Sequence, residues 1–307
     1  MKQIKNMPFS VKERLKNKAR LLKRTFNDTL KFYAMERFLY RLSKSDYANT
    51  FILKGALIFQ VWNRDKFRPT QDIDLLGNTD NSENNIREII KNILLTEVED
   101  DGLVFFPETI ETMLIKEDAD YHGVRVVFKG KLDTAKIDMQ VDVGFDDIIY
   151  PKPEVVKFPV ILNFSNPNIM SYTKESVIAE KFEAMVQLGN QNSRMKDFYD
   201  IWILSLNFSF DIQNLSEAVK KTFDHRNTKL SADIIAFSKD FPDLKQIQWK
   251  AFRNKIKQDD IPESFREIIA DIKRIIVPVI NTTEQDLQWD HKEKVWELSE
   301  RSKGNDL

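Results

Sequence analysis

The stretch Thr70-Gln71-Asp72-Ile73-Asp74-Leu75-Leu76 sets two carboxylates two positions apart at the start of an apolar run. We expect a β-strand here, in which alternate side chains point to the same face of the sheet. Two carboxylates held side by side repel each other unless a cation lies between them. Mg²⁺ suits such a pair because it prefers oxygen ligands and commonly shares them with substrate phosphates. Asp-x-Asp also occurs by chance in soluble proteins, so the interpretation depends on the surrounding sequence.

A third carboxylate lies on the strand predicted for residues 135–143. Polar residues alternate there with apolar ones, and the polar ones are Asp138, Gln140 and Asp142. If this strand neighbours the first, Asp142 completes with Asp72 and Asp74 a site for two Mg²⁺ ions and in-line phosphoryl transfer. Asp138, four positions earlier, is expected at the rim of the site rather than as a ligand.

Composition excludes several other kinds of site. The 307 residues contain no Cys, which excludes disulfides and thiolate zinc sites, and the three His are too far apart in sequence to favour a histidine metal site or a Ser-His-Asp triad. No apolar run approaches the roughly 20 residues that span a bilayer. The first residues lack the apolar stretch of a signal peptide, so we expect a cytoplasmic protein without membrane contact. The length predicts one large or two modest domains.

The charge is distributed unevenly along the chain. Residues 1–45 hold 13 Lys or Arg and three acidic residues, although the net charge of the chain is −1. This asymmetry favours contact with a polyanion such as nucleic acid, and an ordinary solvated helix flank is the alternative.

Periodicity and turn residues predict the elements in outline. An apolar stripe at steps of three and four indicates one or two helices over residues 10–45. A short strand at 51–53 is expected to turn at Gly55 into a helix. A helix is predicted at 82–95 and strands at 102–105, 124–128 and 135–143. Prolines at 151, 153 and 159 mark a boundary. Helices are then expected at 175–189, from about 192 to 202, and at 213–223, 230–239, 245–257, 262–276 and 284–301.

Two blocks of sequence carry a family resemblance. The first comprises residues 53–57 (Leu-Lys-Gly-Ala-Leu) and 68–75 (Arg-Pro-Thr-Gln-Asp-Ile-Asp-Leu). The second comprises residues 176–186 and 192–201, and the strand at 141–147 lies between the two. Together they resemble the AbiEii/AbiGii family of nucleotidyltransferase toxins, a branch of the DNA polymerase beta-like superfamily.

The resemblance implies an α+β fold: a polymerase-beta-like core with a mixed β-sheet, preceded by a basic helical segment and followed by a helical C-terminal domain. We place these parts at residues 1–48, 49–165 and 166–307, with the last contributing Lys181 and the 194–200 block to the cleft. The implied reaction moves a nucleoside monophosphate from an NTP to an acceptor and releases pyrophosphate. Family members are toxins of bacterial toxin–antitoxin and abortive-infection systems, and some resemble enzymes that add nucleotides to the 3′ end of tRNA. A cognate AbiEi-like antitoxin is the implied partner.

The resemblance also implies roles for individual residues. Asp72, Asp74 and Asp142 would hold the two Mg²⁺ ions, with Asp142 on the acceptor side. The nucleotide would be bound by Lys54, the backbone at Gly55, Lys181, Arg194, Lys196 and Asp197. Asp200, and with it Asp197, would position Lys181 through a charged hydrogen bond. Arg68 would pair with a carboxylate or touch the acceptor.

Plainer interpretations exist for the second block. Without the resemblance, Lys181 is more typical of a solvated helix residue. The Lys196–Asp200 and Arg194–Asp197 spacings suit helical ion pairs worth a few tenths of a kcal/mol. Tyr199 and Trp202 are expected in the core rather than against a nucleobase.

One departure from the superfamily pattern concerns nucleotide affinity. Ser or Thr commonly follows the glycine, where this chain has Ala56 after Gly55. The missing hydroxyl removes a charge-assisted hydrogen bond worth roughly 1.5–3 kcal/mol. Our leading interpretation is transfer to RNA, most simply the tRNA 3′ end. The alternatives are transfer to a partner protein and a non-catalytic member that binds its antitoxin or nucleic acid.

Overall fold

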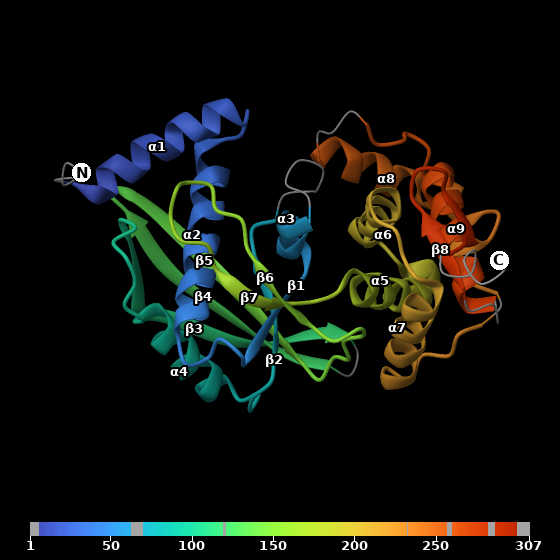
Figure 1. Cartoon of the computed structure of the whole chain (residues 1–307), viewed down its shortest axis with the longest axis horizontal. Coiled ribbons are helices and arrows are strands. Elements are labelled where there is room, and N and C mark those ends of the chain that lie inside the picture. The colour runs from blue at the N-terminus through green and yellow to red at the C-terminus, as the bar shows by residue number, and fades with distance from the viewer. Residues whose placement is uncertain are drawn as a thin grey trace, which may run out of the picture. The chain divides into compact units, whose positions relative to one another are not determined.

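The computed structural model describes residues 6–62, 70–118, 121–231, 233–256, 260–281 and 286–299 (Figure 1). The chain forms two compact units. The first comprises Met1–Asp147 and Glu154–Tyr172, and the second comprises Ile148–Pro153 and Thr173–Leu307. Each unit is described separately below.

Two helices open the first unit, as predicted. α1 spans Met7–Leu21 and α2 spans Phe26–Lys44, and each begins at a side-chain cap, Asn6 for α1 and Thr25 for α2. The predicted apolar stripe is interrupted where α1 ends: Leu15 and Ala19 are buried, whereas Leu22 is exposed.

A mixed sheet forms the centre of the first unit, as the resemblance implies. The described strands are ordered β3 (Leu103–Asp118), β4 (Tyr121–Leu132), β5 (Ala135–Phe145), β2 (Ile73–Gly77), β1 (Phe51–Lys54), β7 (Asn168–Ser171) and β6 (Glu154–Lys157). The β2–β5 and β1–β7 pairs are parallel, and the other pairs are antiparallel. β6 and β7 were not predicted from the sequence, and β3 and β4 extend well beyond the short strands expected.

Alternation along β5 separates the two faces of the sheet. Its buried side chains are Ile137, Met139, Val141 and Val143, while Asp138, Gln140 and Asp142 point the other way, as predicted. α2 packs against β5, and α4 (Glu83–Leu94), capped by Ser82, buries its isoleucine stripe. The acidic side chains therefore lie on the face opposite the apolar core.

After β1 the chain turns at Gly55 into a 3₁₀ turn, η1 (Ala56–Ile58), and one helical turn, α3 (Phe59–Trp62). This confirms the strand-to-helix turn predicted at the glycine.

Helices dominate the described part of the second unit. They are α5 (Lys174–Leu188), α6 (Met195–Asn207), α7 (Ile212–His225), α8 (Phe241–Ile256) and α9 (Phe265–Asn281). Tyr199 and Trp202 are buried on α6, as expected for core residues. Among the described residues, every helix is too short or too polar to cross a bilayer.

Two of the predicted C-terminal helices are wrong. The described residues of 230–239 contain only the 3₁₀ turn η3 (Ile235–Phe237). The Ser231 hydroxyl accepts the backbone N–H of Asp233. Such local side-chain bonds compete with helix formation.

The helix predicted at 284–301 is instead a β-hairpin over its described part, β8 (Leu287–Asp290) and β9 (Val295–Leu298). Trp289 and Trp296 face each other across the two strands. Cross-strand aromatic pairs of this kind stabilise a hairpin.

Candidate functional site

Four charged side chains form a row across four adjacent strands of the first unit. Lys54 on β1 is in register with Asp74 on β2, Asp74 with Asp142 on β5, and Asp142 with Arg125 on β4. Residues in register on neighbouring strands project from the same face of a sheet. The row therefore places two adjacent carboxylates between two cations.

Arg125 makes a two-pronged contact with Asp142 in the row. Its Nε and Nη2 donate to the two carboxylate oxygens of Asp142 at 2.8 and 2.7 Å. These hydrogen bonds, followed by the charges of Asp142, Asp72 and Asp74, raise the pKa of Arg125. The charges of all three predicted carboxylates thus act on this guanidinium. The sequence analysis missed Arg125, which only the β4–β5 register identifies.

Asp72 lies just outside the strand that was predicted to carry it. β2 begins at Ile73, so Asp72 occupies the bend before the strand. It lines a cavity of about 330 Å³ on the polar face of β3–β5. The other lining residues are Lys31, Thr109, Glu111, Val127, Phe128, Lys129, Asp138, Met139 and Gln140. Burial lowers the pKa of Lys31 against the opposing charges of Asp72 and Asp138.

Gly55 packs against the carboxylate of Asp74. Its φ of 68° and ψ of −160° belong to a region that is essentially restricted to glycine. A β-carbon at this position would lie 1.9 Å from Oδ2 of Asp74. The glycine is therefore required both by the backbone and by the close approach of Asp74.

Lys54 forms an ion pair with Asp147, which the sequence analysis did not single out. Its ammonium lies 2.7 Å from Oδ2 of Asp147, and the Tyr172 hydroxyl contacts the same carboxylate oxygen at 3.3 Å. Lys54 and Asp147 are both largely buried. This pair fixes the end of β1 immediately before Gly55.

The residues of the second block come together within the second unit. Lys181 on α5 contacts Asp197 at 2.8 Å and Asp200 at 2.9 Å, both on α6. Asp200 is fully buried, and only 15% of the Lys181 side chain is exposed. The interpretation of Lys181 as a solvated helix residue is therefore wrong. Arg194 lies at the N-cap of α6, and Lys196 is exposed.

We expect Lys181→Met to lower the free energy of unfolding by about 2–3 kcal/mol, because two buried carboxylates lose their shared cation. Denaturant unfolding at neutral pH measures the loss. Adding Asp200→Asn should recover part of it, since the amide does not repel Asp197. Lys220→Met on the exposed face of α7 is the control, and an equal loss in that variant would contradict the buried-pair account.

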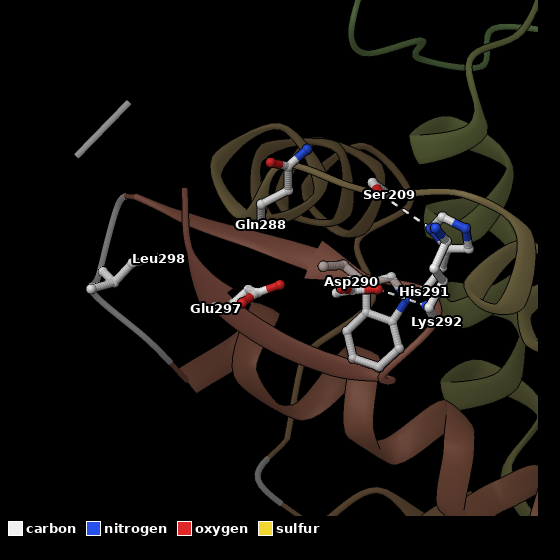
Figure 2. Close-up of a pocket in the computed structure, with 8 residues that line it drawn as sticks. Ser209, Gln288, Asp290, His291, Lys292, Glu297 and Leu298 are labelled. Atoms are coloured by element: carbon white, nitrogen blue, oxygen red, sulfur yellow. Dashed lines mark hydrogen bonds between the residues drawn. The ribbon is translucent and has the colours of Figure 1, made fainter. Parts of the chain in front are cut away.

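A second cavity, of about 300 Å³, lies at the C-terminal hairpin (Figure 2). The Ser209 hydroxyl and Nδ1 of His291 lie 3.3 Å apart there. A carboxylate of Asp290 accepts two backbone N–H groups of the hairpin turn. The Trp289 indole donates to the Ser205 carbonyl. These contacts stabilise the hairpin.

The donor set in the first unit fits a divalent cation. Within the ranges that the structure describes, no three His, Cys, Asp or Glu side chains are grouped closely enough to hold a metal as they stand. Asp142 is instead paired with Arg125, whose guanidinium supplies the positive charge that two adjacent carboxylates need. Asp74 and Asp142 are in register on adjacent strands, so both offer carboxylate oxygens on one face of the sheet. Arg68 lies outside the described residues.

Comparison with known proteins identifies a family for this chain. A family model described as "Nucleotidyl transferase AbiEii toxin, Type IV TA system" matches residues 37–271, which include the carboxylates and the Lys181 block. No curated protein matches the chain. Two structures from Helicobacter pylori are similar, a provisionally assigned nucleotidyltransferase and the protein JHP933. Each is 11% identical to this chain, with a TM-score of 0.48, and each match covers 82% of this chain. The matches cover 94% of the first structure's chain and 91% of the second's. The chain belongs to the AbiEii nucleotidyltransferase toxin family of type IV toxin–antitoxin systems.

Proposed function

We propose that this nucleotidyltransferase transfers a nucleoside monophosphate from an NTP to the 3′ end of tRNA, with Mg²⁺ bound and with release of pyrophosphate. The observation that supports it best is the pairing in register of Asp74 and Asp142, with Gly55 packed against Asp74. A structural sheet has no need of two adjacent carboxylates on one face, because they repel each other.

In this proposal Asp72, Asp74 and Asp142 hold two Mg²⁺ ions. When bound, the ions neutralise charge on the triphosphate and help the acceptor hydroxyl lose its proton. Arg125, released from Asp142, offers a planar guanidinium suited to phosphate oxygens. Lys54, held by Asp147, fixes the turn at Gly55, whose backbone faces the phosphates.

Roles toward the triphosphate remain predictions for the residues of the second unit. These are Lys181, Arg194, Lys196, Asp197 and Asp200. The Lys181 contacts with Asp197 and Asp200 agree with the positioning role assigned to the two carboxylates. Membership of a toxin–antitoxin family implies an antitoxin partner.

The choice of tRNA rests on the family and on the basic N-terminal segment. Some of its cations are paired within the first unit and others are exposed. Lys12, Arg37 and Arg41 are paired with acids inside the first unit. In contrast, Arg20 and the α1–α2 connection, Lys23 and Arg24, are exposed. Exposed cations of this kind favour a polyanionic acceptor over neutral ones.

Incubation with each labelled NTP, total tRNA and Mg²⁺ tests the function. We expect label in RNA, and mass spectrometry of the product identifies the added nucleotide. At sub-saturating tRNA the rate should fall more than tenfold between about 50 mM and about 200 mM salt, for roughly three phosphate contacts. Label that migrates with protein would indicate a protein acceptor in place of RNA. The absence of label in both RNA and protein would overturn the proposal.

A further inference from the structure

Two strands of the sheet continue beyond the carboxylate row. β2 pairs with β5 only over residues 141–145, whereas β4 pairs with β5 back to the turn at residues 132–135. The β4–β5 ribbon therefore extends past the start of β2 toward α1 (Figure 1). Lys12 of α1 is bound to Asp133 in the turn of this ribbon.

The extension has one buried and one open face. Phe128, Leu132, Ile137 and Met139 point to the buried face. Lys129, Lys131 and Lys136 point to the open face and are exposed. Asp138, opposite Lys129, is also exposed, whereas Lys131 lies directly opposite Lys136. Like charges directly opposite each other on paired strands destabilise a sheet, so this placement carries a cost that an anionic ligand would remove.

β3 adds apolar side chains to the same face. Phe106 is in register with Lys129, and Val104 is in register with Lys131. Phe106 is partly exposed, and 53% of Val104 is exposed. An aromatic ring beside exposed lysines is the combination by which proteins bind single-stranded nucleic acid, because bases stack on the ring and cations contact the phosphates.

This face leads directly to the carboxylates. Lys129, Asp138 and Gln140 line the cavity that also contains Asp72, and the Gln140 amide donates to Asp142. A strand lying on the open face would thus end with its terminal hydroxyl beside Asp72 and Asp142.

We propose that the open face of the β3–β4–β5 ribbon, formed by Phe106, Lys129, Lys131 and Lys136, binds the single-stranded 3′ end of the acceptor RNA and directs its last nucleotide into the cavity beside Asp72. This inference rests on the proposed function. A single strand fits better than a duplex, since Phe106 can stack only on an unpaired base.

The test measures RNA binding without catalysis. A short fluorescent single-stranded RNA is titrated with the full-length protein and anisotropy is recorded at several salt concentrations. The triple variant Lys129→Gln, Lys131→Gln, Lys136→Gln should weaken binding about tenfold and reduce the salt slope by about 2, at roughly 0.7 per lost contact on a single strand. Phe106→Ala should weaken binding about tenfold through lost stacking.

A matched control removes the same charge elsewhere. Lys157→Gln, Lys220→Gln and Lys229→Gln replace three exposed lysines on β6, on α7 and after α7. This variant should bind RNA like the wild type. Equal weakening in both triple variants would show that only net charge matters and would overturn the inference.

Measuring KM and kcat for tRNA distinguishes a failure of this inference from a failure of the proposed function. We expect the ribbon variant to raise KM for tRNA about tenfold with a smaller change in kcat. If the wild type labels tRNA and the ribbon variant retains wild-type KM, the inference alone fails. If the wild type labels protein and not RNA, the proposed function fails, and the inference fails with it.

Discussion

Asp74→Asn is expected to lower the rate of nucleotide transfer about 10³-fold, because a metal ligand contributes several kcal/mol to the transition state. Asp74 lies within the row, in register with Lys54 on one side and Asp142 on the other. The amide has the same shape, so the thermal midpoint should change little. Incorporation of labelled NTP per folded molecule measures the effect.

Glu154→Gln is the matched control for that variant. Glu154 is an exposed carboxylate on β6, at the far edge of the same sheet, and its loss should leave transfer unchanged. Induction of both variants and the wild type in bacteria extends the test to toxicity. Growth arrest by Asp74→Asn equal to that of the wild type would favour a non-catalytic toxin that acts by binding.

Gly55→Ala should impair both stability and transfer. The backbone conformation at Gly55 costs a residue with a β-carbon about 1–3 kcal/mol. The new methyl group would also displace the Asp74 carboxylate, since it would lie 1.9 Å from Oδ2. We expect the free energy of unfolding to fall by about 3 kcal/mol and transfer per folded molecule to fall at least 10²-fold, since a displaced ligand misplaces the reacting groups. Denaturant unfolding and single-turnover labelling measure the two effects.

Gly189→Ala separates backbone strain from damage to the site. Gly189 also has a positive φ, 46°, but its neighbour is the flexible end of Ile235 in the second unit. This variant should lose stability without a comparable loss of transfer per folded molecule. If transfer falls equally in both variants, the contact between Gly55 and Asp74 has no special role.

Sequence periodicity predicted the parts of this fold where one face is buried. The alternation along β5 placed Asp142 on the face opposite the apolar core. The apolar stripe placed α1 and α2, and cap residues placed α4 and α5. The hairpin at 287–298 was missed because its stability comes from Trp289 packing against Trp296 and donating to Ser205, contacts that a helical pattern does not reveal.

The candidate site was predicted only as far as local spacing extends. Asp72, Asp74 and Asp142 were identified by their intervals along two strands. Arg125 and Asp147 were missed, because their roles depend on strand register and on a contact between residues 93 positions apart. Register is set by pairing across the sheet, so no single stretch of sequence contains it.

The interrupted first unit limits how this protein can be divided. Its sheet takes β7 and β6 from Glu154–Tyr172, after the chain has passed through residues 148–153 of the other unit. A fragment ending at Asp147 would keep every charged residue of the row and would expose the hydrogen-bonding groups of β1 as a bare edge. Bare edges pair with other chains and promote aggregation. The smallest contiguous piece that closes this edge therefore ends at Tyr172.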